Sequence, residues 1–217
     1  METELHHYEE MDLLLENKDE LWILIKNQNI SYEDFEQFIY TDSYLKACET
    51  FDFTYNKSIY RDNWKIYEFN SPKNHKISNV FFQNFLEGEI SKSLYYKCEN
   101  ETIEFLRELY GSDCYAFYEF NSDSLDINYP AQQSKNVLRS WNFINKNRAA
   151  FTKIRDVSIY QEISYLGIRE IALVYFIFTN RKIIAIPNEC KCIILAEQPL
   201  LNSFSDTRDS FIMYSGE

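Results

Sequence analysis

Three histidines and five cysteines are the side chains of this chain that could act as bases, nucleophiles or metal ligands near neutral pH. His6 and His7 are adjacent, so on a helix they diverge by about 100° and form no metal-binding face. His75 lies in a polar segment after Pro72 and is expected to be solvated. A Cys–His or Ser–His site would need one of these histidines, and the sequence assigns no catalytic residue.

The cysteines give weak signals for nucleophilic or metal chemistry. Cys114 follows Gly111-Ser-Asp113 and is the most nucleophile-like by position, but it also begins an apolar strand, where free cysteine usually packs as a small hydrophobic side chain. Cys190 and Cys192 would point to one face of a strand. A zinc site needs four ligands, and no second pair completes this one. We therefore expect neither a metal nor a cofactor.

A five-residue segment, Tyr-Glu-Phe-Asn-Ser, occurs twice, over 67–71 and 118–122, each time at the end of a predicted strand. Two strands that end in similar turns explain it. A duplicated unit would instead bring Glu68 and Glu119 together as a carboxylate pair. The flanking residues do not align, which favours the first explanation. The four glycines stand apart, which excludes glycine-rich phosphate loops and the G-x-S-x-G elbow.

The first secondary-structure elements that the sequence predicts are two helices. Apolar residues at helical spacing predict a helix over 8–28 with an acidic outer face. A second helix is predicted to begin at Ser31, because Ser31 and Asp34 resemble a capping box. Its expected buried side consists of Phe35, Phe38, Ile39 and Leu45.

Alternation of apolar and polar residues predicts strands over 51–55 and 64–69. Strands are also predicted over 114–120, 171–178, 182–186 and 192–196, where 171–178 is the longest apolar run, with a hairpin at Thr179-Asn-Arg181. Helices are predicted over 80–90, 101–110 and 135–145, the second capped by Asn100 and stopped by Gly111. These patterns predict an α+β fold, with acidic N-terminal helices packed on a largely antiparallel sheet with interspersed helices. We expect one domain over 1–217; if the chain divides, an N-terminal helical lobe should end near residue 50.

The charge of the chain is concentrated at its start. Asp and Glu number 34 against 22 Lys and Arg, a net charge of −12. Residues 1–55 hold 14 acidic side chains against Lys18, Lys26 and Lys46, a net charge of −11. An acidic helical face can be an ordinary solvated surface, or a docking surface that attracts a cationic protein.

The acidic surface leads to the first functional hypothesis, a protein-binding inhibitor that covers a basic partner such as a nuclease toxin. In its acidic, aromatic-rich and glycine-poor composition the chain resembles bacterial or phage proteins that neutralise another protein, such as toxin-immunity proteins; the likeness involves no motif. The expected acidic contacts are Glu9, Glu10, Asp12, Glu16, Asp19, Glu20, Glu33, Asp34 and Glu36. The expected aromatic anchors are Tyr8, Tyr32 and Tyr40.

Two other functions stay open. The first is a hydrolase or transferase effector that uses Cys114 or paired carboxylates. The second is a nucleic-acid-associated regulator that uses the basic stretch from Lys135 to Arg155, where Trp141, Phe143 and Phe151 could stack on bases. The net negative charge makes nucleic acid a weaker expectation.

The sequence also predicts the cellular compartment of the protein. The acidic N-terminus resembles no signal peptide, no apolar run is long enough to cross a membrane, and the odd number of cysteines fits a reducing compartment. We therefore expect a cytoplasmic protein without a membrane partner. A second copy of the chain is a further candidate partner.

Overall fold

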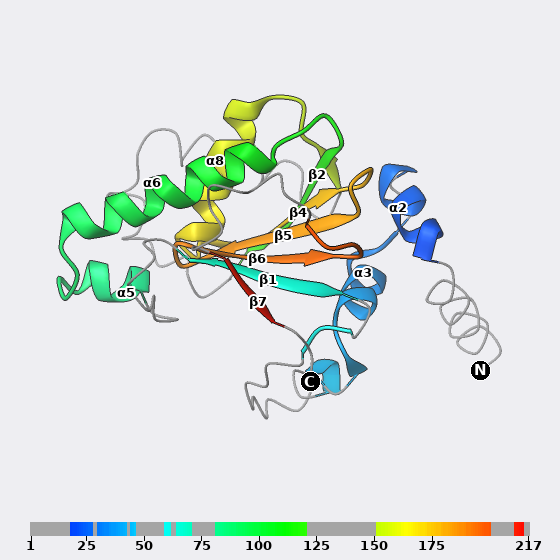
Figure 1. Cartoon of the computed structure of the whole chain (residues 1–217), viewed down its shortest axis with the longest axis horizontal. Helices are drawn as coiled ribbons and strands as arrows, with labels where there is room; N and C mark the ends of the chain where they lie inside the picture. Colours follow the sequence, from blue (N-terminus) through cyan, green and yellow to red (C-terminus); the bar gives the residue numbers. More distant parts are fainter. Residues whose placement is uncertain are drawn as a thin grey trace. The chain divides into compact units, whose positions relative to one another are not determined.

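The computed structural model describes residues 18–27, 30–42, 44–46, 59–61, 64–70, 81–120, 151–200 and 211–214, with the backbone alone at 18–20, 119–120 and 211–214. The chain packs as two compact units, residues 1–64 with 216–217, and residues 65–215. Figure 1 colours them along the sequence. Helices make up most of the described first unit, and a sheet is the centre of the second.

Two helices, α2 (Lys18–Asn27) and α3 (Tyr32–Ile39), pack around Trp64 in the first unit. The buried ring of Trp22 meets the Trp64 ring edge-on, with 6.1 Å between the ring centroids. Phe38 of α3 contacts the same ring edge-on at 5.9 Å. The described apolar positions that predicted α2 and α3 are buried, except Leu45, which lies beyond the end of α3 and is half-buried. Residues 8–17 and 28 of the first predicted helix lie outside the described residues.

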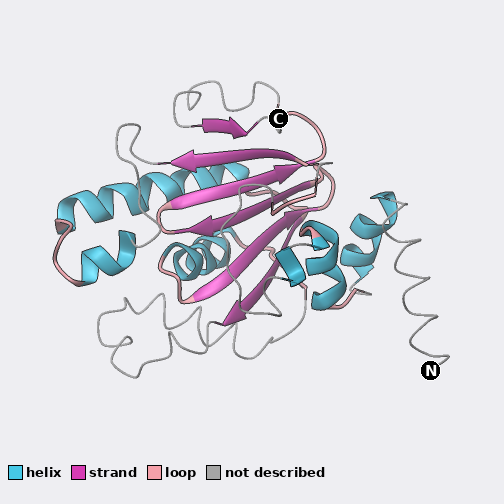
Figure 2. Cartoon of the chain, turned by 90° about the horizontal axis from the view of Figure 1, so that it is seen from below, coloured by secondary structure: helices cyan, strands magenta, loops and turns pink. Residues whose placement is uncertain are grey.

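The second unit contains a seven-stranded sheet in the order β3-β2-β4-β5-β6-β1-β7, and every neighbouring pair is antiparallel. Figure 2 shows these strands side by side. The strands are β1 (Lys65–Asn70), β2 (Cys114–Phe120), β3 (Thr152–Lys153), β4 (Ala172–Phe178), β5 (Ile183–Asn188), β6 (Lys191–Ala196) and β7 (Phe211–Tyr214). Helices and an antiparallel sheet in one chain confirm the α+β class.

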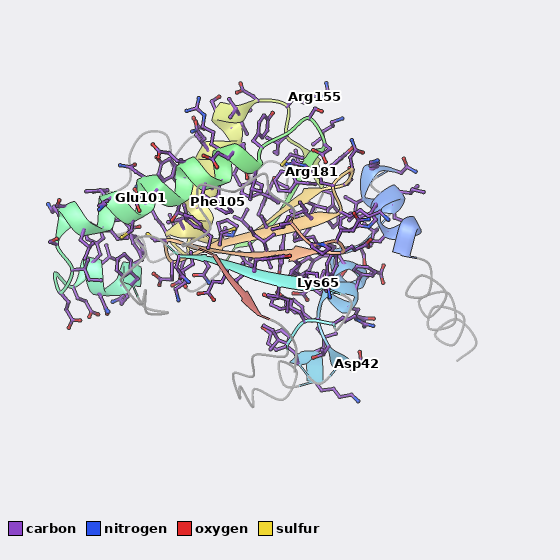
Figure 3. All side chains as sticks on the ribbon, in the orientation of Figure 1. Asp42, Lys65, Glu101, Phe105, Arg155 and Arg181 are labelled. Carbon is purple, nitrogen blue, oxygen red and sulfur yellow. The ribbon has the colours of Figure 1, made fainter. Side chains whose placement is uncertain are left out.

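Helices α6 (Lys92–Leu109) and α8 (Val157–Ile168) lie on the same side of the sheet (Figure 1), and α8 contacts β4 and β5. The short helix α5 (Phe81–Leu86) packs on α6. Side chains fill the space between α6 and the sheet (Figure 3), where Phe105 stacks on Phe69 of β1 with 4.1 Å between centroids. Tyr160 of α8 packs on Phe176 of β4 at 4.2 Å.

The start of α6 differs from the prediction. The helix begins at Lys92, where the Ser91 hydroxyl accepts a hydrogen bond from the Leu94 N–H, and Asn100 lies inside it. The predicted cap at Asn100 is therefore wrong, because the serine upstream caps the helix first. The end of the helix before Gly111 is confirmed.

The patterns missed α8 altogether, as well as the short edge strands β3 and β7. The predicted strands over 64–69, 114–120, 171–178, 182–186 and 192–196 all occur, with bounds that shift by one or two residues. The predicted strand over 51–55 and helix over 135–145 lie outside the described residues.

The boundary between the two units lies at Trp64 and Lys65, beyond the lobe expected over 1–50. The first unit extends this far because Tyr60 pairs with Tyr40 after α3 and Trp64 packs on both helices. That acidic N-terminal helices pack on the sheet remains a prediction.

Candidate functional site

The expected contact surface lies in the first unit, and part of it is described. Asp19 and Glu20 lie on the described backbone of α2, and Tyr32, Glu33, Asp34 and Glu36 lie on α3. The remaining expected contacts of this surface, Tyr8, Glu9, Glu10, Asp12 and Glu16, lie outside the described residues.

The local sequence fixes which side of α3 is acidic. The Ser31 hydroxyl accepts a hydrogen bond from the Asp34 N–H at 3.1 Å and donates one to the Asp34 carboxylate at 2.8 Å. This cap sets the start of the helix, and the register then buries Phe35, Phe38 and Ile39. The N-cap at Ser31 predicted from the sequence is confirmed, while the Asp34 carboxylate bonds the Ser31 hydroxyl instead of the Ser31 N–H that a full capping box would use.

The opposite side of α3 leaves carboxylates accessible to a partner. Glu33 is exposed, and Asp34 and Glu36 are half-buried. The Tyr32 hydroxyl donates a hydrogen bond to Glu36 Oε1, one turn along. Acidic side chains in the first turn of α3 also interact favourably with the positive end of the helix dipole. They therefore stabilise the helix whether or not a partner binds.

Tyr40 does not belong to this surface. Its side chain is only 6% exposed and stacks on Tyr60, with 5.5 Å between ring centroids. The Tyr40 carbonyl accepts a hydrogen bond from Arg61 Nε at 3.1 Å. Its predicted role as an anchor for a partner is therefore wrong, because the ring is buried against Tyr60 at the end of α3.

Cys114 is a core residue rather than a nucleophile. Its side chain is fully buried at the start of β2, burial raises the pKa of its thiol, and the thiol donates a weak hydrogen bond to the Tyr115 carbonyl at 3.7 Å. A reactive cysteine needs an accessible thiolate. The version of an effector that uses Cys114 is therefore contradicted.

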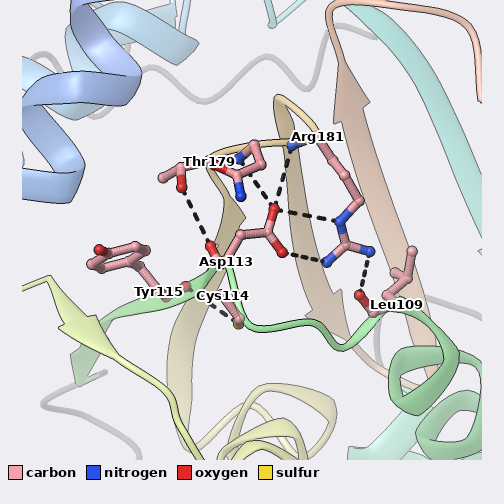
Figure 4. A network of polar contacts seen from close by, with 7 residues as sticks. Leu109, Asp113, Cys114, Tyr115, Thr179 and Arg181 are labelled. Atoms are coloured by element: carbon pink, nitrogen blue, oxygen red, sulfur yellow. Dashed lines mark hydrogen bonds and ion pairs between the residues drawn. The ribbon is translucent and has the colours of Figure 1, made fainter.

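The polar network beside Cys114 fixes the β4–β5 turn (Figure 4). Asp113 Oδ2 accepts hydrogen bonds from the N–H groups of Asn180 and Arg181, and Asp113 Oδ1 lies 3.0 Å from Arg181 Nη2. Arg181 Nη1 also donates to the Leu109 carbonyl at the end of α6, at 2.6 Å. Burial by itself would raise the pKa of Asp113, but the bonds and charge of Arg181 outweigh it and lower the pKa.

Glu68 and Glu119 do not form a carboxylate pair. They lie on β1 and β2, which are separated in the sheet by β4, β5 and β6. Four strand spacings of about 4.8 Å put the two backbones about 19 Å apart, far beyond the separation of a glycosidase pair. The repeated segment therefore marks two strands with similar ends.

The Cys190-Lys-Cys192 motif does not present two thiols on one strand face. Cys190 lies in the β5–β6 turn with a φ of +59°, and only Cys192 lies within β6. Both are buried. Among the residues that the structure describes, no group of three His, Cys, Asp or Glu side chains could hold a metal ion.

Only the end of the basic stretch is described. Lys153 and Arg155 are exposed, and Lys153 lies over the Tyr115 ring. Phe151 is buried against Phe117, with 5.0 Å between centroids, and so cannot stack on bases. A role for the stretch in nucleic-acid binding stays a prediction, since its residues up to 150, with Trp141 and Phe143, lie outside the described part.

An ion pair buried between α6 and the end of α8 was not predicted from the sequence. Arg169 donates from Nε to Glu99 Oε1 at 2.6 Å and from Nη2 to Oε2 at 2.9 Å. The Tyr95 hydroxyl also donates to Glu99 Oε1 at 3.1 Å. One signal was available: Tyr95 and Glu99 are four residues apart on a helix, and so lie on one face.

Comparison with known protein families, curated proteins and solved structures finds no match for this chain. Within the described residues, no helix combines the length and the apolar character that a membrane crossing needs.

Proposed function

We propose that the chain is a protein-binding inhibitor whose acidic N-terminal helices cover a basic partner, in the manner of a toxin-neutralising immunity protein. The observation that supports this most directly is the two-sided character of α3. Its apolar side is buried in the first unit, while Tyr32, Glu33, Asp34 and Glu36 occupy the sides that stay at least partly accessible. These acids belong to the quarter of the chain that holds nearly all of the net charge.

Such a surface would act mainly on the rate of association. Clustered carboxylates attract a cationic protein over roughly 10 Å at 0.1 M ionic strength, which speeds encounter and discriminates against acidic competitors. Glu33 is the best-placed charge, since it is exposed and forms no ion pair with a described residue. The strength of the complex would then depend on a few anchors.

Two side chains of the first unit suit that anchoring role. Tyr32 is half-buried on α3, so its ring is already partly fixed. Ile23 on α2 is 53% exposed, while its neighbours Leu21, Trp22 and Ile25 are buried. An aromatic or branched apolar side chain that is held by its helix loses little conformational entropy on binding. A nuclease is the favoured partner class, because enzymes that act on nucleic acids present basic clefts.

The test is capture of a partner from the source cells by the tagged full-length chain and by a double charge reversal, Glu33→Lys with Glu36→Lys. Asp34 is left unchanged because it bonds the Ser31 cap. We expect the wild-type chain to retain a basic protein whose nuclease activity it inhibits, and the double variant to lose most of that retention.

The matched control is Glu104→Lys with Glu108→Lys, two exposed acids of α6 that change the net charge by the same amount. Retention should survive in this variant. Equal loss in both variants would show that total charge, and not the surface of α3, determines binding. Retention unchanged by the α3 reversal would refute the proposal.

A further inference from the structure

The two edges of the sheet differ in how they are protected against pairing with another chain. An edge strand presents unpaired N–H and C=O groups, and natural proteins protect it by shortness, charged side chains or proline. The edge strand β3 is two residues long and contains Lys153. The opposite edge strand, β7, is four residues long, Phe-Ile-Met-Tyr, and has neither a charged residue nor a proline. β7 therefore lacks the usual protection against a further strand.

One side of β7 is occupied by β1 (Figure 1). The two strands are antiparallel, with Ile66 opposite Tyr214 and Phe69 opposite Phe211. No strand of the described chain lies on the other side of β7, which is the last in the sheet order. In an antiparallel ladder, hydrogen bonds join residues that lie directly opposite each other, and successive residues of a strand bond to opposite sides. Half of the backbone groups of β7 therefore face away from the sheet.

The hydrogen bonds of the ladder determine which residues of β7 face away. The Glu197 N–H donates to the Lys182 carbonyl at 3.3 Å, which extends the β5–β6 pairing by one residue pair. Glu197 thus bonds toward β5, and Ala196 before it bonds toward β1. Lys65 lies opposite Ala196 and bonds toward β6, so Ile66 bonds toward β7.

A second hydrogen bond gives the same assignment from the other end of the sheet. The Ile154 N–H donates to the Cys114 carbonyl at 3.0 Å, so Cys114 bonds toward β3. Alternation through β2, β4, β5 and β6 again turns Ala196 toward β1. The two independent bonds agree, so the assignment does not depend on one turn.

On β7, Tyr214 and Ile212 therefore bond to β1, and Phe211 and Met213 turn their N–H and C=O groups away from the sheet. No backbone hydrogen bond connects these outward groups to another residue of the described chain. They have the spacing of donors and acceptors along a strand, so the outer side of β7 is a template for one more antiparallel strand.

We propose that β7 pairs with β7 of a second copy of the chain, antiparallel and about a twofold axis at Ile212, so that two sheets join into one. In this register Phe211 lies opposite the partner's Met213, and each outward N–H donates to an outward carbonyl of the other copy. Ile212 lies opposite the partner's Ile212 in a pair without hydrogen bonds, where the Cα atoms are about 4.5 Å apart.

A second copy suits this edge because of its symmetry and its charge. A twofold antiparallel pairing of identical strands satisfies the outward groups of both strands at once, and twofold symmetry is the commonest in homo-oligomers. The uncharged strand brings no like charges together. Residues 1–55 hold −11 of the net charge of −12, so the second unit, which contains β7, is close to neutral. The pairing is also independent of the acidic surface of α3, which belongs to the first unit.

Sedimentation velocity of the full chain, from about 10 µM to about 1 mM, tests the pairing, because an interface this small gives a weak dimer. We expect a reversible monomer–dimer equilibrium in this range. Met213→Pro removes an outward N–H and keeps the bonds to β1, and an edge strand tolerates proline at such a position. It should raise the dissociation constant of the dimer by about tenfold or more, since each copy loses a hydrogen bond. A wild-type chain that stays monomeric, as it would if β7 paired only with another protein, would overturn the proposal.

The matched control is Lys153→Pro, which removes an outward N–H from the opposite edge strand. Because Ile154 bonds toward β2, Lys153 before it faces away from the sheet. The dimer of this variant should be as tight as that of the wild-type chain. A dimer that both proline variants weaken equally, or that Met213→Pro leaves unchanged, would refute the pairing through β7.

Substitutions at Ile212 test the twofold axis, and they provide the test even if Met213→Pro does not fold. Ile212→Lys and Ile212→Glu each place two like charges opposite each other across the axis, so each variant alone should be monomeric. An equimolar mixture of the two variants should restore the dimer, because a lysine then faces a glutamate. A mixture that stays monomeric, or single variants that dimerise like the wild-type chain, would contradict the proposal.

Discussion

At the scale of single residues, two buried tyrosines of the second unit differ in whether their hydroxyl has a partner. Tyr95 donates to Glu99, whereas the Tyr160 hydroxyl is buried with no partner in the described structure. We expect Tyr160→Phe to leave the free energy of unfolding unchanged or to raise it by about 1 kcal/mol, because it removes a desolvated polar group. Tyr95→Phe should lower it by about 1.5 to 3 kcal/mol. Urea denaturation of both variants measures this, and a larger loss in Tyr160→Phe would show a hidden partner.

The Glu99–Arg169 pair supports a second prediction. Arg169→Met leaves the Glu99 carboxylate buried opposite an apolar side chain, and should lower the free energy of unfolding by about 3 kcal/mol or more. Glu99→Leu combined with Arg169→Met removes both charges and should recover much of that loss. Chemical denaturation of the single and double variants gives the coupling energy. If the double variant is as unstable as Arg169→Met, then removing both charges relieves no desolvation cost, and the prediction is wrong.

Residue chemistry was only partly predictable. The sequence identified Cys114 as either a nucleophile or a core residue, and burial decides for the core. The burial of Glu189 could not be predicted, because nothing in the sequence distinguishes a buried glutamate from a solvated one. The sequence did give one usable sign, the two residues between β5 and β6, since a loop of that length without glycine or asparagine is unusual.

At the scale of elements, the β4–β5 turn depends on Asp113, and this dependence should vary with pH. The pKa of Asp113 is lower in the folded chain than its ordinary value of 3.8. Its stabilising contribution is therefore complete above pH 4 and is lost as the pH falls through the folded pKa. We expect Asp113→Asn to be less stable than wild type at pH 7, and the difference to shrink towards pH 2. Thermal unfolding from pH 2 to pH 7 measures it, with Glu104→Gln as the control; a constant difference would contradict the assignment.

The contact between α8 and β5 depends on a glycine. A Cβ at Gly167 would lie 2.8 Å from the backbone oxygen of Pro187, which cannot turn aside as a flexible side chain can. Gly167→Ala should therefore lower the free energy of unfolding by about 1 to 3 kcal/mol. Ser93→Ala, at an exposed position of α6, should change it little. Denaturant titration compares the two, and a neutral Gly167→Ala would mean that α8 can shift away from the sheet.

Strands and helices were predicted correctly where the apolar pattern was clear, and were missed where it was ambiguous. The strands from β4 to β6 are runs of apolar residues separated by short turns, so their existence followed from the sequence. Helix α8 is rich in isoleucine and tyrosine, which favour strands. The sequence feature that could have predicted α8 is Asp156, a residue that favours the N-cap position. Its carboxylate accepts a hydrogen bond from the Ser158 N–H and caps the helix.

At the scale of the whole molecule, the fold class was predictable and the strand order was not. β1 is the first strand of its unit, yet it pairs with β6 and β7, far along the chain. Such pairings depend on long-range packing that local periodicity does not encode. They also separate Glu68 from Glu119, so the spatial arrangement alone contradicts the carboxylate pair suggested by the repeated segment.

The most direct test of the central claim is the association rate of the captured basic partner with the chain, measured by stopped-flow fluorescence from 0.05 to about 0.5 M salt. If the surface of α3 attracts the partner, the wild-type rate should fall steeply with salt, and Glu33→Lys with Glu36→Lys should lower both the rate at low salt and this slope. Glu104→Lys with Glu108→Lys should keep most of the wild-type slope. Equal rates and slopes for the wild-type chain and the α3 variant would contradict the claim.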